Sequence, residues 1–357
     1  MRRRKVALLG AGGWIGQHFV RLLAEHPFFE DPILGGGGRT SGKKLEDLWL
    51  LPEEGPPPSL ARKKLVSLTP GSLAKEGVEV VFSALRTEEA ATFETQLAQR
   101  GIAVFSTTPA HRMGERVPLV VPEVNGVHLD ILKWRKEKGF LVTNSNCVTA
   151  GLVIALKPLL PLLKPKQVNV TTYQALSGAG FPGVASLSMC DNVLPYIEHE
   201  EEKLEVESRK ILGTMNRRGF LPFNLHVYAN CARVSTREGH LEAVSVEAKS
   251  EVSPEEIRKA WTGFHPIADA EGSSLPTAPE APIIYRKEED RPQPLMDRWA
   301  GSPTRARGMA VTVGRLRVRD NKVMFYLLVH NAVRGGAGGS ILTAELSVKK
   351  AILGGQD

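Results

Sequence analysis

The first residues of the chain form the pattern that most limits its possible folds. Residues 6–9 are apolar, residues 10–16 read Gly-Ala-Gly-Gly-Trp-Ile-Gly, and apolar residues then recur at helical spacing through residue 23. This order predicts a strand, a glycine turn and a helix. Such a turn lets the backbone approach a pyrophosphate, which binds the helix N-terminus. The pattern therefore predicts an α/β domain that binds a dinucleotide.

The next residues repeat strands and helices. Residues 78–85 and 102–106 have the character of strands, and residues 88–99 between them have the character of a helix. A strand, a helix and a second strand in this order favour a mostly parallel sheet. We therefore expect a doubly wound, Rossmann-like domain in the N-terminal part of the chain.

The end of the second predicted strand, residues 32–34, indicates which dinucleotide binds. NAD-specific sites usually place a carboxylate there for the ribose hydroxyls, but this chain has none. Arg39, Thr40 and Ser41 follow instead, and a guanidinium with hydroxyls suits a 2′-phosphate. We predict NADP rather than NAD, although a solvated basic loop is the plain alternative.

A single cysteine occupies a second strand-to-helix turn. Residues 140–143 are β-prone, residues 148–163 are apolar and predict a helix, and Cys147 lies between them. The N–H groups and partial positive charge of a helix N-terminus favour a thiolate. Cys147 is thus a candidate covalent nucleophile; the alternative is a small buried apolar residue.

The second half of the chain is predicted to form a separate domain. Its expected strands cover 167–173, 227–234, 241–252, 311–317 and 323–329. Residues 200–212 predict a charged helix, and the proline-rich stretch 275–307 is predicted to be an irregular connection. A second glycine turn at 331–339 leads into a last helix, which we expect to return to the first domain.

Composition excludes several classes of protein. The 357 residues carry a formal net charge of +7, but basic residues are mixed with acids and lack an aromatic platform, so no nucleic-acid partner is predicted. No apolar run is long enough to span a membrane, and no signal peptide is visible after Met1. Three scattered cysteines predict neither a disulfide framework nor a metal site, and they fit a reducing cytoplasm.

Further motifs extend over most of the chain. They include Asn144-Ser145-Asn146-Cys147, Gln174 through Gly183, Asp191 through Ile197, Glu200 through Gly213, Arg233 with Gly239-His240, Leu275 through Pro279, Arg291 through Pro294 and His330 through Gly335. Together with the glycine turn and Arg39 through Gly42, they resemble aspartate-β-semialdehyde dehydrogenase of the archaeal and fungal branch. The sequence departs from that family at Gly12 and Ser145, where threonine and proline are common, but neither change removes a reacting group.

This resemblance implies two domains and a reaction. It implies an NADP-binding domain at 1–146, completed by a C-terminal helix at 335–357, and an α+β catalytic and dimerisation domain at 147–334 with a mixed or antiparallel sheet. The implied reaction is the NADP- and phosphate-dependent interconversion of L-aspartate 4-semialdehyde and L-4-aspartyl phosphate through a thioester on Cys147. A homodimer or homotetramer is also implied, without a metal.

The resemblance assigns roles to individual residues. It makes Cys147 the nucleophile, His240 the acid/base and Gln174 an orienting residue. It assigns substrate and phosphate binding to Arg112, Asn146, Glu200, Lys203 and Arg233, with Arg233 on the substrate carboxylate and Glu200 on its amino group. It assigns cofactor binding to Gly10, Gly12, Gly13, Trp14, Ile15, Gly16, Arg39, Thr40, Ser41, Ser83, Ser177, Gly178 and Asn331.

Three competing functions are distinguished by sequence features. A related malonyl-CoA reductase shares the stretch from Asp297 to Gly301 but generally lacks the pair Glu200 and Lys203 and the asparagine at 146. N-Acetylglutamyl-phosphate reductase has different motifs around its cysteine and histidine. A non-catalytic NADP sensor predicts loss of the nucleophile or of the acid/base, and both are present in this chain.

Overall fold

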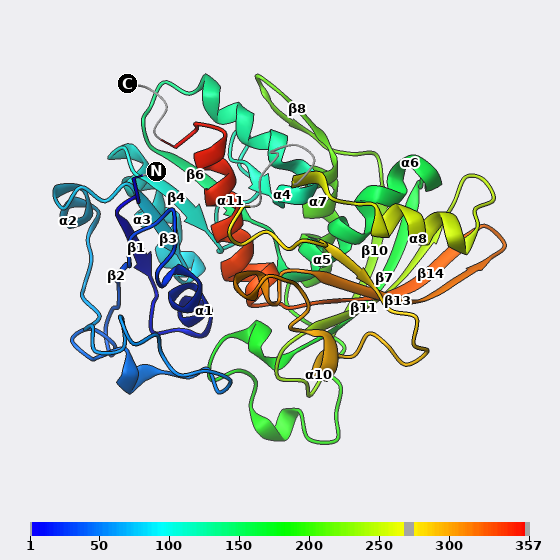
Figure 1. The fold of residues 1–357 in the computed structure, drawn as a ribbon, viewed down its shortest axis with the longest axis horizontal. Coiled ribbons are helices and arrows are strands. Elements are labelled where there is room, and N and C mark those ends of the chain that lie inside the picture. The colour runs from blue at the N-terminus through cyan, green and yellow to red at the C-terminus, as the bar shows by residue number, and fades with distance from the viewer. Residues whose placement is uncertain (1, 268–274, 354–357) are drawn as a thin grey trace.

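The first domain is built on a six-stranded parallel sheet. The computed structural model describes residues 2–267 and 275–353 (Figure 1). The sheet contains β1 (Val6–Leu9), β2 (Ile33–Leu34), β3 (Val80–Ser83), β4 (Ala103–Ser106), β5 (Leu119–Val120) and β6 (Phe140–Asn144), in the order β2-β1-β3-β4-β6-β5. All of its pairings are parallel. The predicted Rossmann-like sheet is confirmed.

Helices cover both faces of this sheet because its strands are apolar on both sides. On one face, α1 (Trp14–Leu23) and α11 (Gly338–Lys349) share a core with Leu8, Phe82 and Phe105. On the other face, α2 (Pro70–Lys75) and α3 (Thr87–Gln99) pack near Val81 and Val104. The short helix α4 (Pro122–Asn125) precedes β6.

The second domain is built on a mixed six-stranded sheet. It contains β7 (Gln167–Gln174), β10 (His226–Arg233), β11 (His240–Glu247), β12 (Ile283–Tyr285), β13 (Val311–Arg319) and β14 (Lys322–Val329), in the order β10-β7-β11-β14-β13-β12. The two outer pairings, β10 with β7 and β12 with β13, are parallel, and the inner ones are antiparallel. A separate hairpin joins β8 (Thr214–Asn216) and β9 (Gly219–Leu221).

One face of this sheet is covered by helices α5 (Cys147–Leu156), α7 (Glu200–Leu212) and α8 (Pro254–Thr262). Residues alternate along each strand, so that Val244 and Val246 are buried beneath the helices while Ala243 and Ser245 on the opposite face are only partly buried. The charged helix predicted at 200–212 is confirmed with the same bounds.

Three sequence predictions need correction. The apolar helix expected at 148–163 is interrupted: a 3₁₀ turn carrying Pro158 separates α5 from α6 (Leu160–Leu163), because proline removes a helix hydrogen bond. The strand expected at 241–252 ends at Glu247. The stretch 275–307 is not wholly irregular, since β12 extends the second sheet and α10 (Pro294–Asp297) follows it.

The last helix lies between the two sheets (Figure 1). A π-helical turn at Val333–Ala337 leads into α11, which is buried from Gly338 to Val348. Residues 354–357, the end of the segment assigned to this helix, lie outside the described residues. The domain limits at 146, 147, 334 and 335 remain a prediction. Among the described residues, no helix combines the length and apolar character needed to cross a membrane.

Candidate active site

Cys147 is the first residue of α5, directly after β6, as the sequence predicts. The Asn146 Oδ1 atom caps the helix by accepting from the Val148 and Thr149 N–H groups at 3.0 and 3.4 Å. Gly335 of the π-helical turn packs on the cysteine: a Cβ added there would lie 2.5 Å from the Cys147 Cβ. The C-terminal segment of the chain therefore packs directly against the candidate nucleophile.

Helix α7 supplies two carboxylates that hold the residue before the cysteine. Glu200 Oε1 accepts from Asn146 Nδ2 at 2.8 Å, and Glu207 Oε2 accepts from the Asn146 backbone N–H at 2.6 Å. The other oxygen of Glu207 accepts from Arg112 Nη1 at 2.9 Å. Asn146, Glu200 and Arg112 are thus brought together from three separate segments of the chain.

The expectation that the helix N-terminus favours a Cys147 thiolate is wrong for the free protein. Burial, with a smaller contribution from the Glu200 carboxylate, raises the pKa of this half-buried thiol to about 12. Arg112, Arg233 and the Val148 N–H lower the pKa, but by less. Desolvation penalises the charged sulfur more than the helix stabilises it, so the resting group is a thiol.

Arg233 and His240 converge at Gly178. A Cβ added to Gly178 would lie 2.7 Å from Arg233 Nη1 and 3.2 Å from His240 Nε2. Arg233 Nη1 donates to the Ala175 carbonyl oxygen at 2.8 Å, and the Ala175 N–H donates to His240 Nδ1 at 2.9 Å. Burial, with the nearby Arg233 charge, lowers the pKa of His240 to about 3. The imidazole is neutral at physiological pH.

The structure places two further predicted residues beside this group. Lys203 Nζ lies 3.8 Å from Glu200 Oε2, so the pair expected on one face of α7 does form an ion pair. Gln174 is buried at the end of β7, where its Nε2 donates to Thr172 Oγ1 at 3.2 Å. The Gln174 amide therefore contacts its own strand in this state.

The glycine turn after β1 has the form that a dinucleotide requires. Gly10 has a φ of +78°, and a Cβ at Gly16 would lie 2.0 Å from the Gly10 carbonyl oxygen. No side chain caps the N-terminus of α1 at Gly13. Uncapped N–H groups beside a close-packed glycine turn fit a pyrophosphate.

The other residues assigned to the cofactor form two groups. Thr40 lies near Gly12, since a Cβ at Gly12 would lie 3.3 Å from Thr40 Cγ2; Arg39 and Ser41 are exposed beside it. Ser83 is buried at the carboxyl end of β3, where ligands bind in parallel sheets. These positions fit a dinucleotide that extends from the turn.

The second group lies beside the turn that precedes His240. Asn331 Nδ2 donates to Ser177 Oγ at 2.8 Å, while Asn331 Oδ1 accepts from the Gly239 N–H at 2.9 Å. Trp14, which the resemblance assigns to cofactor binding, donates from its Nε1 atom to the buried Glu238 at 2.9 Å. Glu238 thus connects α1 to the turn that carries His240.

Sequence reasoning missed Glu207, Lys210 and Glu238 as residues that hold the site. The spacing on α7 could have indicated Glu207, which lies two turns after Glu200 on the same helix face. Glu238, two residues before His240, had no comparable signal.

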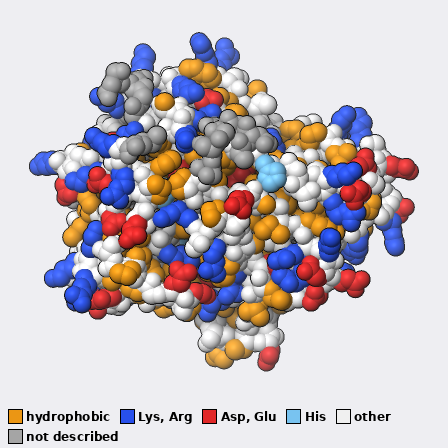
Figure 2. Space-filling view, in the orientation of Figure 1, with side chains coloured by type: hydrophobic (Ala, Val, Ile, Leu, Met, Phe, Trp, Pro, Cys, Tyr) orange, Lys and Arg blue, Asp and Glu red, His pale blue; other side chains and the backbone are white. Residues whose placement is uncertain are grey.

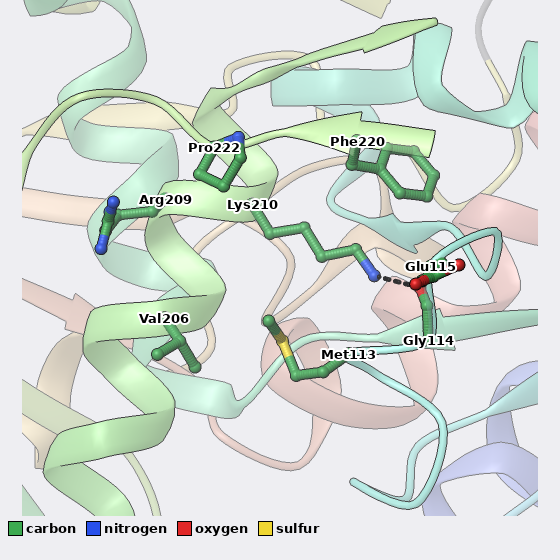
Figure 3. Close-up of a pocket in the computed structure, with 8 residues that line it drawn as sticks. All are labelled: Met113, Gly114, Glu115, Val206, Arg209, Lys210, Phe220 and Pro222. Atoms are coloured by element: carbon green, nitrogen blue, oxygen red, sulfur yellow. Dashed lines mark hydrogen bonds between the residues drawn. The ribbon is translucent and has the colours of Figure 1, made fainter. Parts of the chain in front are cut away.

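Lys210 is buried beside a cavity of about 310 Å³ (Figure 3). Its side chain extends from α7, and Nζ donates to the Gly114 carbonyl oxygen at 2.9 Å. Nζ also donates to the carbonyl oxygens of Arg112 and Val117 at 2.6 and 3.0 Å. The Phe220 ring lies 4.8 Å from the ammonium. Lys210 therefore anchors the loop that carries Arg112.

Two family models together match most of the chain. Residues 5–131 match the semialdehyde dehydrogenase NAD-binding domain, and residues 156–334 match the semialdehyde dehydrogenase dimerisation domain. A curated aspartate-semialdehyde dehydrogenase from Archaeoglobus fulgidus is 44% identical over 98% of this chain and 100% of the relative. The chain belongs to the aspartate-semialdehyde dehydrogenase family.

Two other comparisons bear on membership of this family. The crystal structure of the Candida albicans aspartate-semialdehyde dehydrogenase with NADP superposes with a TM-score of 0.85 at 35% identity, covering 98% of this chain and 100% of that chain. A malonyl-CoA reductase (NADP) from Metallosphaera sedula is 38% identical over 98% of both chains. The predicted resemblance, the α/β fold and an oxidoreductase with an NAD(P)-binding domain are confirmed.

The surface shows charges of both signs. Figure 2 shows lysine and arginine side chains interspersed with aspartate and glutamate over the face in view. The positive formal charge of +7 is therefore spread over this face and does not form one basic patch there.

Proposed function

We propose that this chain catalyses the NADP- and phosphate-dependent interconversion of L-aspartate 4-semialdehyde and L-4-aspartyl phosphate, a step in the biosynthesis of lysine, threonine, methionine and isoleucine. The observation that carries this proposal is the contact of Asn146 with Glu200 next to Cys147. A carboxylate that contacts the residue before Cys147 supports binding of a substrate amino group close to the sulfur. Family membership supports the same reaction.

Cys147 and His240 carry the chemistry of the proposed reaction. The Cys147 sulfur adds to the aldehyde carbon and, after oxidation, holds the acyl group as a thioester. Splitting the reaction through a thioester keeps the acyl group activated for transfer to phosphate. His240 serves as the acid/base beside the reacting carbonyl, with Gln174 as an orienting residue.

Charged side chains bind the two substrates. Arg233 binds the substrate carboxylate and Glu200 binds its amino group, because each offers the opposite charge. Arg112, Asn146 and Lys203 bind phosphate. The pairing of Arg112 with Glu207 supports a fixed guanidinium orientation before phosphate arrives.

The residues of the glycine turn fit NADP. The pyrophosphate would be held by the turn residues Gly10, Gly12, Gly13, Trp14, Ile15 and Gly16. The 2′-phosphate would be held by Arg39, Thr40 and Ser41. The remaining parts of NADP would be held by Ser83, Ser177, Gly178 and Asn331. When bound, the nicotinamide accepts or supplies the hydride. The absence of a carboxylate after β2 supports NADP over NAD.

A homodimer or homotetramer is part of this proposal. In the described part of the chain, α5, α7 and α8 pack on one face of the second sheet, and Tyr228 on the opposite face is 52% exposed. A match to a dimerisation domain over residues 156–334 supports association through this domain. A free cysteine nucleophile suits a reducing cytoplasm.

Malonyl-CoA reduction is the second candidate. The Metallosphaera sedula relative and the stretch at 297–301 support it. The ion pair of Lys203 with Glu200, and Asn146 before the cysteine, favour an amino-acid substrate instead.

The test compares both reactions in one preparation. Reduction of NADP⁺ with aspartate semialdehyde, with and without phosphate, is measured beside NADPH oxidation with malonyl-CoA, for the wild type and Cys147→Ser. We expect semialdehyde turnover that requires phosphate and is lost in the variant. Malonyl-CoA activity alone would transfer the assignment to the reductase, and inactivity in both assays would favour a binding protein.

A further inference from the structure

Glu123 and Arg334 form a buried ion pair outside the residues assigned to the site. Arg334 Nη1 and Nη2 donate to Glu123 Oε1 and Oε2 at 2.7 and 2.9 Å, and both side chains are 1% exposed. Two parallel hydrogen bonds between a guanidinium and a carboxylate fix the orientation of both groups. The pair therefore holds two segments of the backbone at one defined separation and angle.

The pair joins the first sheet to the C-terminal segment of the chain. Glu123 lies on α4, directly after β5. The Asn125 side chain ties that helix to the strand, since it accepts from the Val121 N–H and donates to the Leu119 carbonyl oxygen, both at 2.8 Å. Arg334 lies on the π-helical turn that leads into α11, beside α4 (Figure 1). One partner is thus fixed to the sheet, and the other belongs to an irregular turn.

The turn that carries Arg334 packs directly on the nucleophile. A Cβ added to Gly335 would lie 2.5 Å from the Cys147 Cβ and 2.7 Å from its Cα, so the two backbones are as close as a glycine permits. The Asn144 Nδ2 atom donates to the Gly335 carbonyl oxygen at 3.0 Å. Any movement of Gly335 therefore changes the position of Cys147.

The same turn contacts residues assigned to the cofactor. A Cβ added to Gly336 would lie 3.4 Å from the Asn331 carbonyl oxygen and 3.5 Å from Ile15 Cδ1, at the start of α1. One short turn thus touches both the helix that carries the sulfur and the residues proposed to hold the dinucleotide. Its position determines how these two groups lie relative to each other.

The turn does not fix its own geometry. Its hydrogen bonds include those from the Gly335 N–H to the His330 carbonyl oxygen at 3.1 Å and from the Ala337 N–H to the Ala332 carbonyl oxygen at 2.9 Å. Each spans one residue more than the hydrogen bonds of an α-helix. Such π-helical turns are rare and are found frequently at functional sites. The ion pair supplies the outside constraint that this turn needs.

Stability alone does not explain the pair. Taking two charges out of water costs free energy that their attraction offsets only in part, and well-packed apolar residues in their place are often as stable. Within residues 2–267 and 275–353, the buried Arg334 Nε atom has no hydrogen-bond partner, which adds to this cost. Apolar side chains could fill the same space, but they would not fix the orientation of the turn.

We propose that Glu123 and Arg334 are a positioning pair that holds Gly335 against Cys147 and so fixes the nucleophile relative to the bound cofactor. Neither residue touches the reacting atoms, because both act through the π-helical turn. This inference rests on the proposed function, in which Cys147 must meet both a substrate and the cofactor. A misplacement of about 1 Å in such an arrangement can cost roughly a hundredfold in rate.

A double variant that removes both charges tests this role. Glu123→Leu with Arg334→Met keeps much of the apolar bulk, so we expect a folded protein with a Tm near that of the wild type. Its kcat for NADP⁺ reduction should fall about 10- to 100-fold, while the KM values for phosphate and NADP change less than about twofold, because the residues that bind them stay in place. A folded double variant with the wild-type kcat would overturn the proposal.

A single variant covers the case in which the double variant does not fold. Arg334→Lys keeps the positive charge but cannot form two parallel hydrogen bonds. We expect it to fold and to lose about tenfold in kcat, and full activity in this variant would overturn the proposal. The control, Arg4→Met with Glu79→Leu, removes an ion pair of 2.7 Å at the amino ends of β1 and β3 and should leave kcat unchanged.

Alkylation of Cys147 tests the packing without turnover. A loosened turn lets reagent and water reach the sulfur. The rate at which iodoacetamide alkylates Cys147 in the free enzyme at about pH 8, followed by peptide mass spectrometry, should therefore rise at least about threefold in Arg334→Lys and in the double variant. It should stay unchanged in the control. Unchanged rates in folded variants of the pair would overturn the proposal.

This readout separates the inference from the proposed function, because it requires neither substrate nor cofactor. A wild type that is inactive toward aspartate semialdehyde would refute the proposed function, and the alkylation rates would still decide whether the pair positions Cys147.

Discussion

Glu207 is expected to control phosphate binding although it carries no assigned role. Its two oxygens accept from Arg112 Nη1 at 2.9 Å and from the Asn146 N–H at 2.6 Å, and its side chain is 2% exposed. In Glu207→Gln only one oxygen remains, and the new NH₂ group faces a donor. One charge-assisted hydrogen bond is lost, which costs roughly 1.5–3 kcal/mol.

That energy converts into a measurable loss of activity. At about 1.4 kcal/mol for each factor of ten, kcat/KM for phosphate should fall roughly 10- to 150-fold in Glu207→Gln. The KM for NADP should change little, because the glycine turn lies on the first sheet, away from α7. The assay is NADP⁺ reduction at varied phosphate, with thermal unfolding measured in parallel.

The matched control uses an exposed residue of the same helix. Glu202→Gln makes the same chemical change at an exposed position of α7 and should leave kcat/KM for phosphate unchanged. If Glu207→Gln also keeps the wild-type value while folding normally, the contact of Glu207 with Arg112 does not serve phosphate binding, and the reasoning is refuted.

Three other measurements test the electrostatics of the site. Burial lowers the pKa of Lys210 to about 8, so its ammonium is lost as the pH rises through that value. The wild-type KM for phosphate should therefore rise above about pH 8 towards the higher KM of Lys210→Met. Parallel pH profiles for the two proteins would contradict this. Burial raises the pKa of Cys147 to about 12, so little thiolate is present near neutral pH. The rate at which iodoacetamide alkylates Cys147 in the free enzyme, followed by peptide mass spectrometry, should increase about tenfold per pH unit up to pH 9. A rate that reaches a plateau near pH 7 would indicate a thiolate. Burial alone would raise the pKa of Glu238, but the hydrogen bond from His18 and the neighbouring His330 and Trp14 lower it. The Glu238 carboxylate therefore stabilises the fold above the pKa of an ordinary carboxyl group, and this stabilisation is lost as the pH falls through the lowered pKa of Glu238. Glu238→Gln should therefore lower the Tm at pH 7 and flatten the decline in Tm below about pH 4, and an unchanged pH profile would exclude this contribution.

The local patterns of the chain predicted the order of its elements and the place of its nucleophile. The apolar run at 6–9 before a glycine turn was sufficient to predict β1 and α1. The β-prone residues 140–143, followed by the apolar run at 148–163, placed Cys147 at the start of a helix. These features depend on short-range periodicity and turn chemistry, which the sequence contains directly. The strand β12 was missed because its three residues lie in a proline-rich stretch and are stabilised by pairing with β13.

The chemical state of the site depended on contacts that only the tertiary structure makes. The sequence by itself determined which groups are available: one thiol at a helix start, one histidine after an arginine, and a charged helix. Only folding brought Glu200 and Glu207 against Asn146 and packed Gly335 against Cys147. Burial and the nearby Glu200 carboxylate then reversed the expected pKa shift of Cys147, because desolvation and electrostatic interactions depend on distances between residues that lie far apart in the chain.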